Sequence, residues 1–286
     1  MPDVKLSHPD KLLFPDDGIT KADLAGYYAG VADAMLPHLR DRPMNLWRWN
    51  NGIDGPRVVQ QDIPKGAPDW VGRVETPRRK GGTNCHAMVQ DAETLRWLAN
   101  QNCITPHVWT ARRDKLDRPD RLVFDLDPPE GTDFAVVREA AQLAGEHLRS
   151  AGLEPFAMVT GSKGIHVVAP LKRTRPTLWV RERAGELGAE IAAGSPETLT
   201  TEWRKDKREG RILVDTARNT YGQTVVAPYA VRALPGAPVA TPLAWEELSD
   251  ADLSAQSWTV RTVGERLAER GDPWADISRH ARAMPG

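Results

Sequence analysis

Apolar residues recur at helical spacing in four stretches of the chain. Leu24, Val31 and Met35 follow this spacing and predict a helix over residues 20–36. Thr20 stands at its start, where a hydroxyl can cap the first turn. The same pattern predicts three more helices, over residues 91–100, 133–150 and 177–193.

Short runs of β-type sequence lie between these helices. They cover residues 44–49, 85–89, 121–127, 156–160, 165–169, 212–216 and 224–227. Strands interleaved with helices predict an α/β or α+β fold. Two stretches rich in Pro and Gly, residues 52–77 and 234–242, are predicted to be long surface connections. Neither stretch marks a domain boundary.

The composition is that of a globular protein of ordinary polarity. The 38 Lys and Arg nearly cancel the 39 Asp and Glu, so any basic surface for nucleic acid must be local. Two cysteines, Cys85 and Cys103, leave no CxxC zinc site and make a disulfide framework unexpected. The first residues lack the apolar segment of a secretory signal, and no apolar run is long enough to cross a bilayer. These features predict a cytoplasmic protein.

Two carboxylates share one face of the strand predicted over residues 121–127. Side chains alternate along a strand, so Asp125 and Asp127 point the same way, with Cα atoms about 6–7 Å apart. Their repulsion is relieved by a divalent cation such as Mg²⁺ or Mn²⁺, which prefers oxygen ligands. For Asp127, which precedes two prolines, the start of a turn is an equally good explanation. It is a weaker one for Asp125, because Asp is disfavoured within strands.

A third acid, Asp215, ends the apolar run of residues 212–214. Three carboxylates suit phosphoryl transfer with two metal ions, one at the attacking hydroxyl and one at the leaving pyrophosphate.

The turn Thr160-Gly-Ser-Lys-Gly164 joins two predicted strands between these acids. Its glycines allow exposed amides to face an anion, while Ser162 and Lys163 add a hydroxyl and a charge. His166 follows on the second strand, where it can hydrogen-bond a triphosphate. The turn is not a Walker A motif, and an ordinary hairpin turn is the alternative explanation.

A basic cluster precedes Asp215. Its members are Arg204, Lys205, Lys207, Arg208 and Arg211. Asp206 and Glu209 within it favour a solvated loop, and the functional alternative is a loop that lies near phosphates.

Further motifs occur in order along nearly the whole chain. They are Ser7–Lys11, Phe14–Pro15, Ile19–Lys21, Asn51–Gly55, Pro64–Trp70, Trp97–Gln101, His107, Arg118–Pro128, Thr160–His166 and Val226–Arg232. Together they resemble the archaeo-eukaryotic primase superfamily, above all the polymerase domain of bacterial ATP-dependent DNA ligase D and its stand-alone relatives. The resemblance implies a primase-polymerase catalytic fold with two β-sheets flanked by helices and the active site in the cleft between them. It also implies one catalytic domain over residues 1–286, with the 5′-phosphate-binding elements in residues 1–40.

The resemblance assigns roles to individual residues. The catalytic and metal-binding residues it implies are Asp125, Asp127 and Asp215. The implied ligands of the incoming triphosphate are Lys163, His166 and Arg232, with Thr160, Ser162 and His107 nearby. Lys11 and Lys21 correspond to a pocket for the 5′-phosphate beyond a gap or break, and the alternative is two solvated lysines.

The implied reaction is template-dependent attack of a primer 3′-hydroxyl on the α-phosphorus of an NTP or dNTP, with release of pyrophosphate. Two divalent ions, Mn²⁺ or Mg²⁺, are the implied cofactors. The implied setting is non-homologous end joining or gap filling in the cytoplasm, associated with the nucleoid and with no membrane. The implied partners are DNA with gaps or broken ends, preferably 5′-phosphorylated, the end-binding protein Ku and an ATP-dependent DNA ligase.

The chain departs from the family pattern at Gln61, where a lysine is usual, and at Asn84–Val89, where a hydrophobic-aromatic strand is common. Three alternatives to a repair polymerase stay open. A de novo primase would use the same chemistry, a metal-dependent nuclease would not need the triphosphate ligands, and an inactive DNA-end-binding module would not need the acids. The sequence leaves open whether the chain is a stand-alone protein and whether it prefers ribonucleotides.

Overall fold

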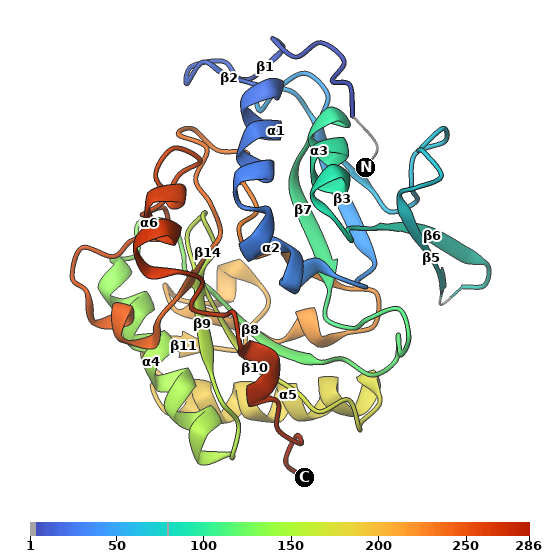
Figure 1. The fold of residues 1–286 in the computed structure, drawn as a ribbon. Coiled ribbons are helices and arrows are strands. Elements are labelled where there is room, and N and C mark those ends of the chain that lie inside the picture. The colour runs from blue at the N-terminus through green and yellow to red at the C-terminus, as the bar shows by residue number, and fades with distance from the viewer. Residues whose placement is uncertain (1–3, 79) are drawn as a thin grey trace. The chain divides into compact units, whose positions relative to one another are not determined.

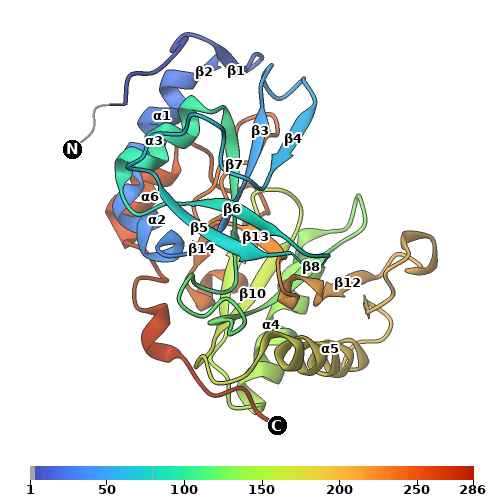
Figure 2. The same ribbon diagram turned by 90° about the vertical axis from the view of Figure 1, so that its right-hand side faces the viewer.

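The computed structural model describes residues 4–78 and 80–286 (Figures 1 and 2). The chain forms two compact units, and each is built from three separate segments. The first unit consists of Met1–Asp114, Thr224–Ala240 and Trp258–Gly271, and the second of Lys115–Gln223, Thr241–Ser257 and Asp272–Gly286. Because the chain returns to each unit, no single position in the sequence divides them. One catalytic domain over the whole chain stays a prediction.

The first unit contains a six-stranded sheet in the order β13-β7-β3-β6-β5, with β4 paired to β3. The strands are β3 (Met44–Trp49), β4 (Arg57–Gln60), β5 (Gly72–Pro77), β6 (Thr83–Met88), β7 (Cys103–Trp109) and β13 (Thr224–Val226). Its helices are α1 (Lys21–Gly30), α2 (Ala32–Leu39), α3 (Ala92–Asn100) and α6 (Val263–Arg270), and a hairpin of β1 (Leu12–Phe14) and β2 (Ile19–Thr20) precedes α1. Helices α1, α2 and α3 pack on one another, and α3 also packs on β7 (Figure 1).

Thr20 caps α1 as predicted. Its hydroxyl accepts the backbone N–H of Asp23 at 3.2 Å, and the Asp23 carboxylate accepts the Thr20 N–H at 2.8 Å. The single helix predicted over residues 20–36 is wrong, because the chain leaves helical geometry at Val31 and restarts as α2. Gly30 lies at this break, and glycine is a poor helix former.

The second unit is built around another six-stranded sheet, in the order β11-β12-β8-β10-β9-β14. Its strands are β8 (Arg121–Asp127), β9 (Phe156–Val159), β10 (Ile165–Pro170), β11 (Leu199–Thr200), β12 (Ile212–Asp215) and β14 (Thr241–Leu243). Helices α4 (Phe134–Ser150) and α5 (Thr177–Ala193) pack against this sheet. A Cβ at Gly188 of α5 would lie 3.8 Å from both Phe124 and Val214, so α5 covers the face that these two side chains share.

Two kinds of sequence prediction have clear outcomes. The α/β class with two main sheets is confirmed, as are helices over residues 91–100, 133–150 and 177–193 and the seven predicted strands, within one or two residues at their ends. The long connection over residues 52–77 is wrong in part because it contains β4 and β5, and β14 begins inside the stretch 234–242. Strand β7 was not predicted, since it is buried on both faces and shows no polar alternation.

No helix in the described part of the chain is both long and apolar enough to span a membrane. Four short 3₁₀ helices, η1 (Lys205–Lys207), η2 (Ala217–Asn219), η3 (Trp245–Ser249) and η4 (Ile277–His280), complete the second unit.

The turn between β9 and β10 is pressed against β8. The Thr160 N–H donates to the Gly164 carbonyl at 3.0 Å, and the Gly164 N–H donates to the Thr160 hydroxyl at 3.3 Å. A Cβ at Gly164 would lie 2.1 Å from the carbonyl oxygen of Leu126, which no side chain can do without moving the backbone. Gly161 has a φ of +65°, which also favours glycine.

We expect Gly164→Ala to destabilise the protein by about 1–3 kcal/mol, because the added methyl group collides with backbone rather than with a flexible side chain. Gly185→Ala is the matched control, since a Cβ there meets no atom within 4 Å and alanine favours the helix. Urea unfolding of both variants measures the difference. Equal stability of the two variants would show that the turn has room to shift.

Candidate active site

Three polar side chains form a row across the middle of the second sheet. Asp125 on β8 is paired with Asp215 on β12 and, on its other side, with His166 on β10. Directly paired residues of antiparallel strands point to the same face, with Cβ atoms about 4.5–5.5 Å apart. The row therefore lies on the face opposite α5, because Phe124 and Val214 alternate with the acids.

Asp127 lies two residues beyond this row on the same face and is held by two cations. The Lys163 ammonium is 2.8 Å from one carboxylate oxygen, and a guanidinium nitrogen of Arg208 is 3.0 Å from the other. Arg208 is fixed further, since it donates to the carbonyls of Glu202 at 3.2 Å and Trp203 at 3.1 Å. The turn of β9–β10 and the basic loop thus meet at the same carboxylate.

Arg218 links the two acids of the row and was not predicted. Its Nε lies 3.5 Å from a carboxylate oxygen of Asp125 and 3.5 Å from one of Asp215. The next residue, Asn219, is buried and exchanges hydrogen bonds with the backbone of Val123 at 2.9 and 2.7 Å, which ties η2 to β8. The only sequence signal was an Arg-Asn pair shortly after an acid at a strand end.

Burial dominates the electrostatics of Asp215. Removal from water raises the pKa of its carboxyl above the ordinary value of 3.8. The N–H of Ala217, which donates to it at 2.7 Å, and the nearby Arg218 act in the opposite direction. Asp125 and Asp127 add like-charge repulsion, which reinforces the upward shift. Ionisation of Asp215 therefore costs more free energy in the folded protein than in water.

The three acids fit a divalent ion by chemical type, since they offer hard oxygen donors on one face. As placed, no three His, Cys, Asp or Glu side chains in residues 4–78 and 80–286 are gathered into a group that could hold a metal ion. The cationic side chains of Lys163, Arg208 and Arg218 lie beside these oxygens instead. The imidazole Nε2 of His166 is 3.5 Å from a carboxylate oxygen of Asp125.

The basic loop divides into two parts. Arg204 pairs with Asp206 at 2.7 Å on the surface, as expected of a solvated loop, whereas Arg208 reaches Asp127. Arg208 is thus the member of the loop that contacts one of the three acids. The sequence predicts only the cluster as a whole.

The other residues predicted to bind the nucleotide include Thr160, His107 and Arg232. Thr160 is buried and braces the turn, with its hydroxyl 3.1 Å from the Gly164 carbonyl. His107 and Arg232 belong to the first unit. The ring of His107 stacks on Trp47 with centroids 3.6 Å apart. Their roles in nucleotide binding stay predictions.

Lys21 is not a solvated lysine, so that alternative is wrong for this residue. Its side chain is buried, and its ammonium donates to the Asn100 carbonyl at 3.2 Å and lies 3.4 Å from the Ser7 hydroxyl. The Lys11 ammonium donates to the Asn50 carbonyl, 39 residues further along the chain.

Positive charge accumulates around Lys21. Burial lowers the pKa of its ammonium below the ordinary value of 10.5, and the charges of Lys11 and Arg48 lower it further. A bound anion would relieve the repulsion among Lys11, Lys21 and Arg48, so these three cations suit an anion-binding site. Gln61, at the position where the family has a lysine, instead accepts a hydrogen bond from the Asn84 amide at 3.0 Å.

Comparison with known proteins identifies similar sequences and structures. Residues 20–274 match the LigD primase-polymerase domain family. The chain is 34% identical over 277 residues to the multifunctional non-homologous end joining DNA repair protein LigD of Mycobacterium tuberculosis. This alignment covers 94% of this chain and 36% of that protein. It is 30% identical over 285 residues to the bifunctional non-homologous end joining protein LigD of Bacillus subtilis, with 99% and 46% covered. The chain thus spans less than half the length of either relative.

The fold is also that of a solved structure. The polymerase domain from Mycobacterium tuberculosis ligase D, determined in complex with DNA, superposes with a TM-score of 0.90 at 32% identity. The superposition covers 98% of this chain and 99% of that one.

We expect Asp215→Asn to raise the melting temperature at neutral pH in EDTA. The amide oxygen still accepts the Ala217 N–H, while the buried charge is gone. Because the folded-state pKa is raised, ionised Asp215 opposes folding above that pKa, and this cost disappears as the pH falls through it toward 3.8. The advantage of the variant should therefore shrink in acid.

The control is Asp252→Asn, an exposed carboxyl of the same unit. Thermal unfolding over a pH series is the measurement. A lower melting temperature for Asp215→Asn at neutral pH would mean that its ion pair with Arg218 outweighs burial.

Proposed function

Because the chain belongs to the LigD primase-polymerase domain family, we propose that it extends the 3′-hydroxyl of a DNA strand on a template, as a nucleotidyltransferase of end-joining repair. The observation that supports this most directly is the row of Asp125 and Asp215 with Asp127 beside it on one sheet face. A sheet fixes such acids more rigidly than loops do, which phosphoryl transfer requires.

The acids are proposed to hold two divalent ions, Mn²⁺ or Mg²⁺. When bound, these ions would activate the attacking hydroxyl and neutralise the charge of the leaving pyrophosphate. For this to happen, one or more of Lys163, Arg208 and Arg218 must move away from the carboxylates. The Lys163 side chain has room to move into solvent, because it is about half exposed at 49%.

The chain's own basic groups are proposed to bind the triphosphate of an NTP or dNTP. Lys163 and His166 lie beside the acids, so phosphate oxygens near the acids are within their reach. Ser162 lies next to Lys163 in the turn, and its hydroxyl can orient the same group. Arg232 and His107 belong to the first unit, and their contacts with the nucleotide stay predictions.

DNA with gaps or broken ends is the proposed substrate, and Ku and an ATP-dependent DNA ligase are the proposed partners. The solved relative in complex with DNA and the end-joining names of the sequence relatives support this setting. Action on such DNA would associate the protein with the nucleoid.

The family match does not favour a de novo primase. Extension of a primed template but not of an unprimed one would separate the two activities. A metal-dependent nuclease would shorten the primer instead, and an inactive end-binding module would bind DNA without changing it.

We expect Asp125→Ala and Asp127→Ala each to reduce primer extension at least about a thousandfold, which corresponds to about 4 kcal/mol of transition-state stabilisation. The assay is extension of a primer on gapped DNA, with NTPs or dNTPs and Mn²⁺ or Mg²⁺. Glu246→Ala, which removes an exposed acid of the same unit, is the control. Extension by either Asp variant near the wild-type rate would contradict the assignment.

We also propose that Lys11 and Lys21 bind the 5′-phosphate downstream of the gap. Wild type is expected to prefer a 5′-phosphate over a 5′-hydroxyl by about tenfold or more, as for charge-assisted hydrogen bonds. The double variant Lys11→Ala, Lys21→Ala is expected to lose this preference. Lys5→Ala, an exposed lysine nearby in sequence, should retain it.

The same preference should depend on pH. Since the pKa of Lys21 is lowered, its ammonium loses its proton in the free protein as the pH rises toward 10.5. A bound phosphate favours the charged form, so the preference should fall over that alkaline range. Binding titrations on both DNAs measure it, and equal affinities at neutral pH would refute the pocket.

A further inference from the structure

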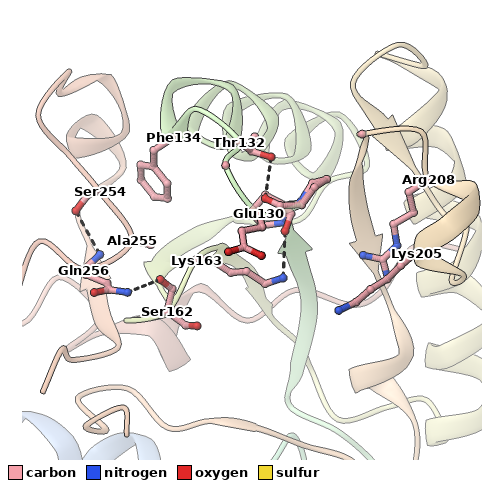
Figure 3. Close-up of a pocket in the computed structure, with 14 residues that line it drawn as sticks. Glu130, Thr132, Phe134, Ser162, Lys163, Lys205, Arg208, Ser254, Ala255 and Gln256 are labelled. Carbon is pink, nitrogen blue, oxygen red and sulfur yellow. Dashed lines mark hydrogen bonds between the residues drawn. The ribbon is translucent and has the colours of Figure 1, made fainter. Parts of the chain in front are cut away.

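A pocket of about 760 Å³ opens at the end of β8, next to Asp127. Figure 3 shows Phe134 and the segment Ser254–Gln256 on one side of it, Lys205 and Arg208 on the other, and Lys163 between them. All of its lining residues belong to the second unit. Its volume lies within the range of pockets that bind small ligands and nucleotides.

One side of the pocket is suited to a flat apolar group. The ring of Phe134 lies on this side (Figure 3), and Pro128 and Pro129 add apolar lining to the pocket. The Gln256 side chain completes this side, and its amide donates to the Ser162 carbonyl at 2.9 Å (Figure 3). This hydrogen bond fixes the orientation of the Gln256 amide. Aromatic rings with fixed polar groups beside them bind nucleobases through stacking and hydrogen bonds.

The charge of the pocket matches a single phosphodiester. Three cations, Lys163, Lys205 and Arg208, line it together with Glu130. Lys163 and Arg208 also share Asp127, so three positive groups face two negative ones, an excess of one positive charge. Because Lys163 and Arg208 are paired with Asp127, Lys205 is the cation of the pocket that can take the single charge of a nucleotide within a strand.

Building on the proposed function, we propose that this pocket holds the 3′-terminal nucleotide of the strand that is extended. Its base lies against Phe134 and Pro129, and its phosphate faces Lys205. The sugar then lies toward Asp127, which brings the 3′-hydroxyl to the acids. Asp127 lies two residues along β8 from the row of Asp125 and Asp215, so the primer end approaches the row from the end of the strand.

Photocrosslinking tests the position of the terminal base directly. A primer with 5-iododeoxyuridine and no 3′-hydroxyl at its terminus is annealed to a gapped template, irradiated with the full chain, and the attached peptide is mapped by mass spectrometry. We expect attachment within residues 128–134 or 254–256. A primer labelled ten or more nucleotides upstream, and 5-iodouridine triphosphate as the free nucleotide, are the comparison probes.

The expected result is attachment to these residues from the primer terminus but not from the triphosphate. Attachment from the triphosphate alone would overturn the proposal and make the pocket part of the incoming-nucleotide site. Attachment of the primer terminus only to other residues would overturn it too.

Kinetics of pocket variants give an independent readout. Phe134→Leu keeps an apolar side chain without the stacking ring, and Gln256→Ala removes the amide. Phe134→Leu is expected to raise the KM for the primer-template at least about fivefold, the lower end of the effect of losing one stacked base. Gln256→Ala is expected to raise it at least about twofold, as for the loss of one hydrogen bond. The KM for the nucleotide and kcat should change less than about twofold. Gln142→Ala, which removes a glutamine on α4 that contacts Ser249 at 3.3 Å, is the matched control.

Lys205→Ala should lower the slope of log Kd for primer DNA against log salt by about one, as for the loss of one phosphate contact. Lys172→Ala, an exposed lysine of the same unit, should leave the slope unchanged. If the wild type extends primers while both pocket variants keep a wild-type KM for the primer, the pocket proposal fails and the proposed function stands. If the wild type extends no primer, the proposed function itself fails.

Discussion

Repulsion between carboxylates is the constraint on which the second unit depends. Asp125 and Asp215 face each other across two paired strands, and Asp127 stands beside them. Such an arrangement persists only where packing fixes the strands and opposite charges lie close by. Helix α5 supplies the packing from behind, and the buried Asn219 supplies a direct tie between β8 and the residues after Asp215.

The cations around the acids come from three different places in the sequence. Lys163 belongs to the β9–β10 turn, Arg208 to the loop before β12, and Arg218 to the short helix after it. Each therefore connects one loop to the central strand β8. A change in the charge held by the acids would alter the contacts of all three loops, and residues of two of them line the pocket described above.

The part of this site that the sequence predicts is the part governed by local rules. Period-two alternation correctly placed Asp125 and Asp127 on one face of a strand, and local chemistry identified Thr20 as a helix cap. The pairing of Asp215 with Asp125, and the reach of Arg218 to both, depend on strand order and register, which alternation does not encode. The burial of Lys21 was likewise hidden, because its partners Ser7 and Asn100 are distant in sequence.

The close contact at Gly164 couples the position of the β9–β10 turn to that of strand β8, which bears two of the acids. The turn that presents Lys163 rests on the carbonyl of Leu126, between Asp125 and Asp127. A side chain at residue 164 would therefore press on the strand that bears the acids, which leaves little freedom to adjust the proposed phosphate contact by reshaping this turn. Adaptation to other substrates has to proceed through side chains at the tip of the turn, or through the loops that approach the acids from elsewhere.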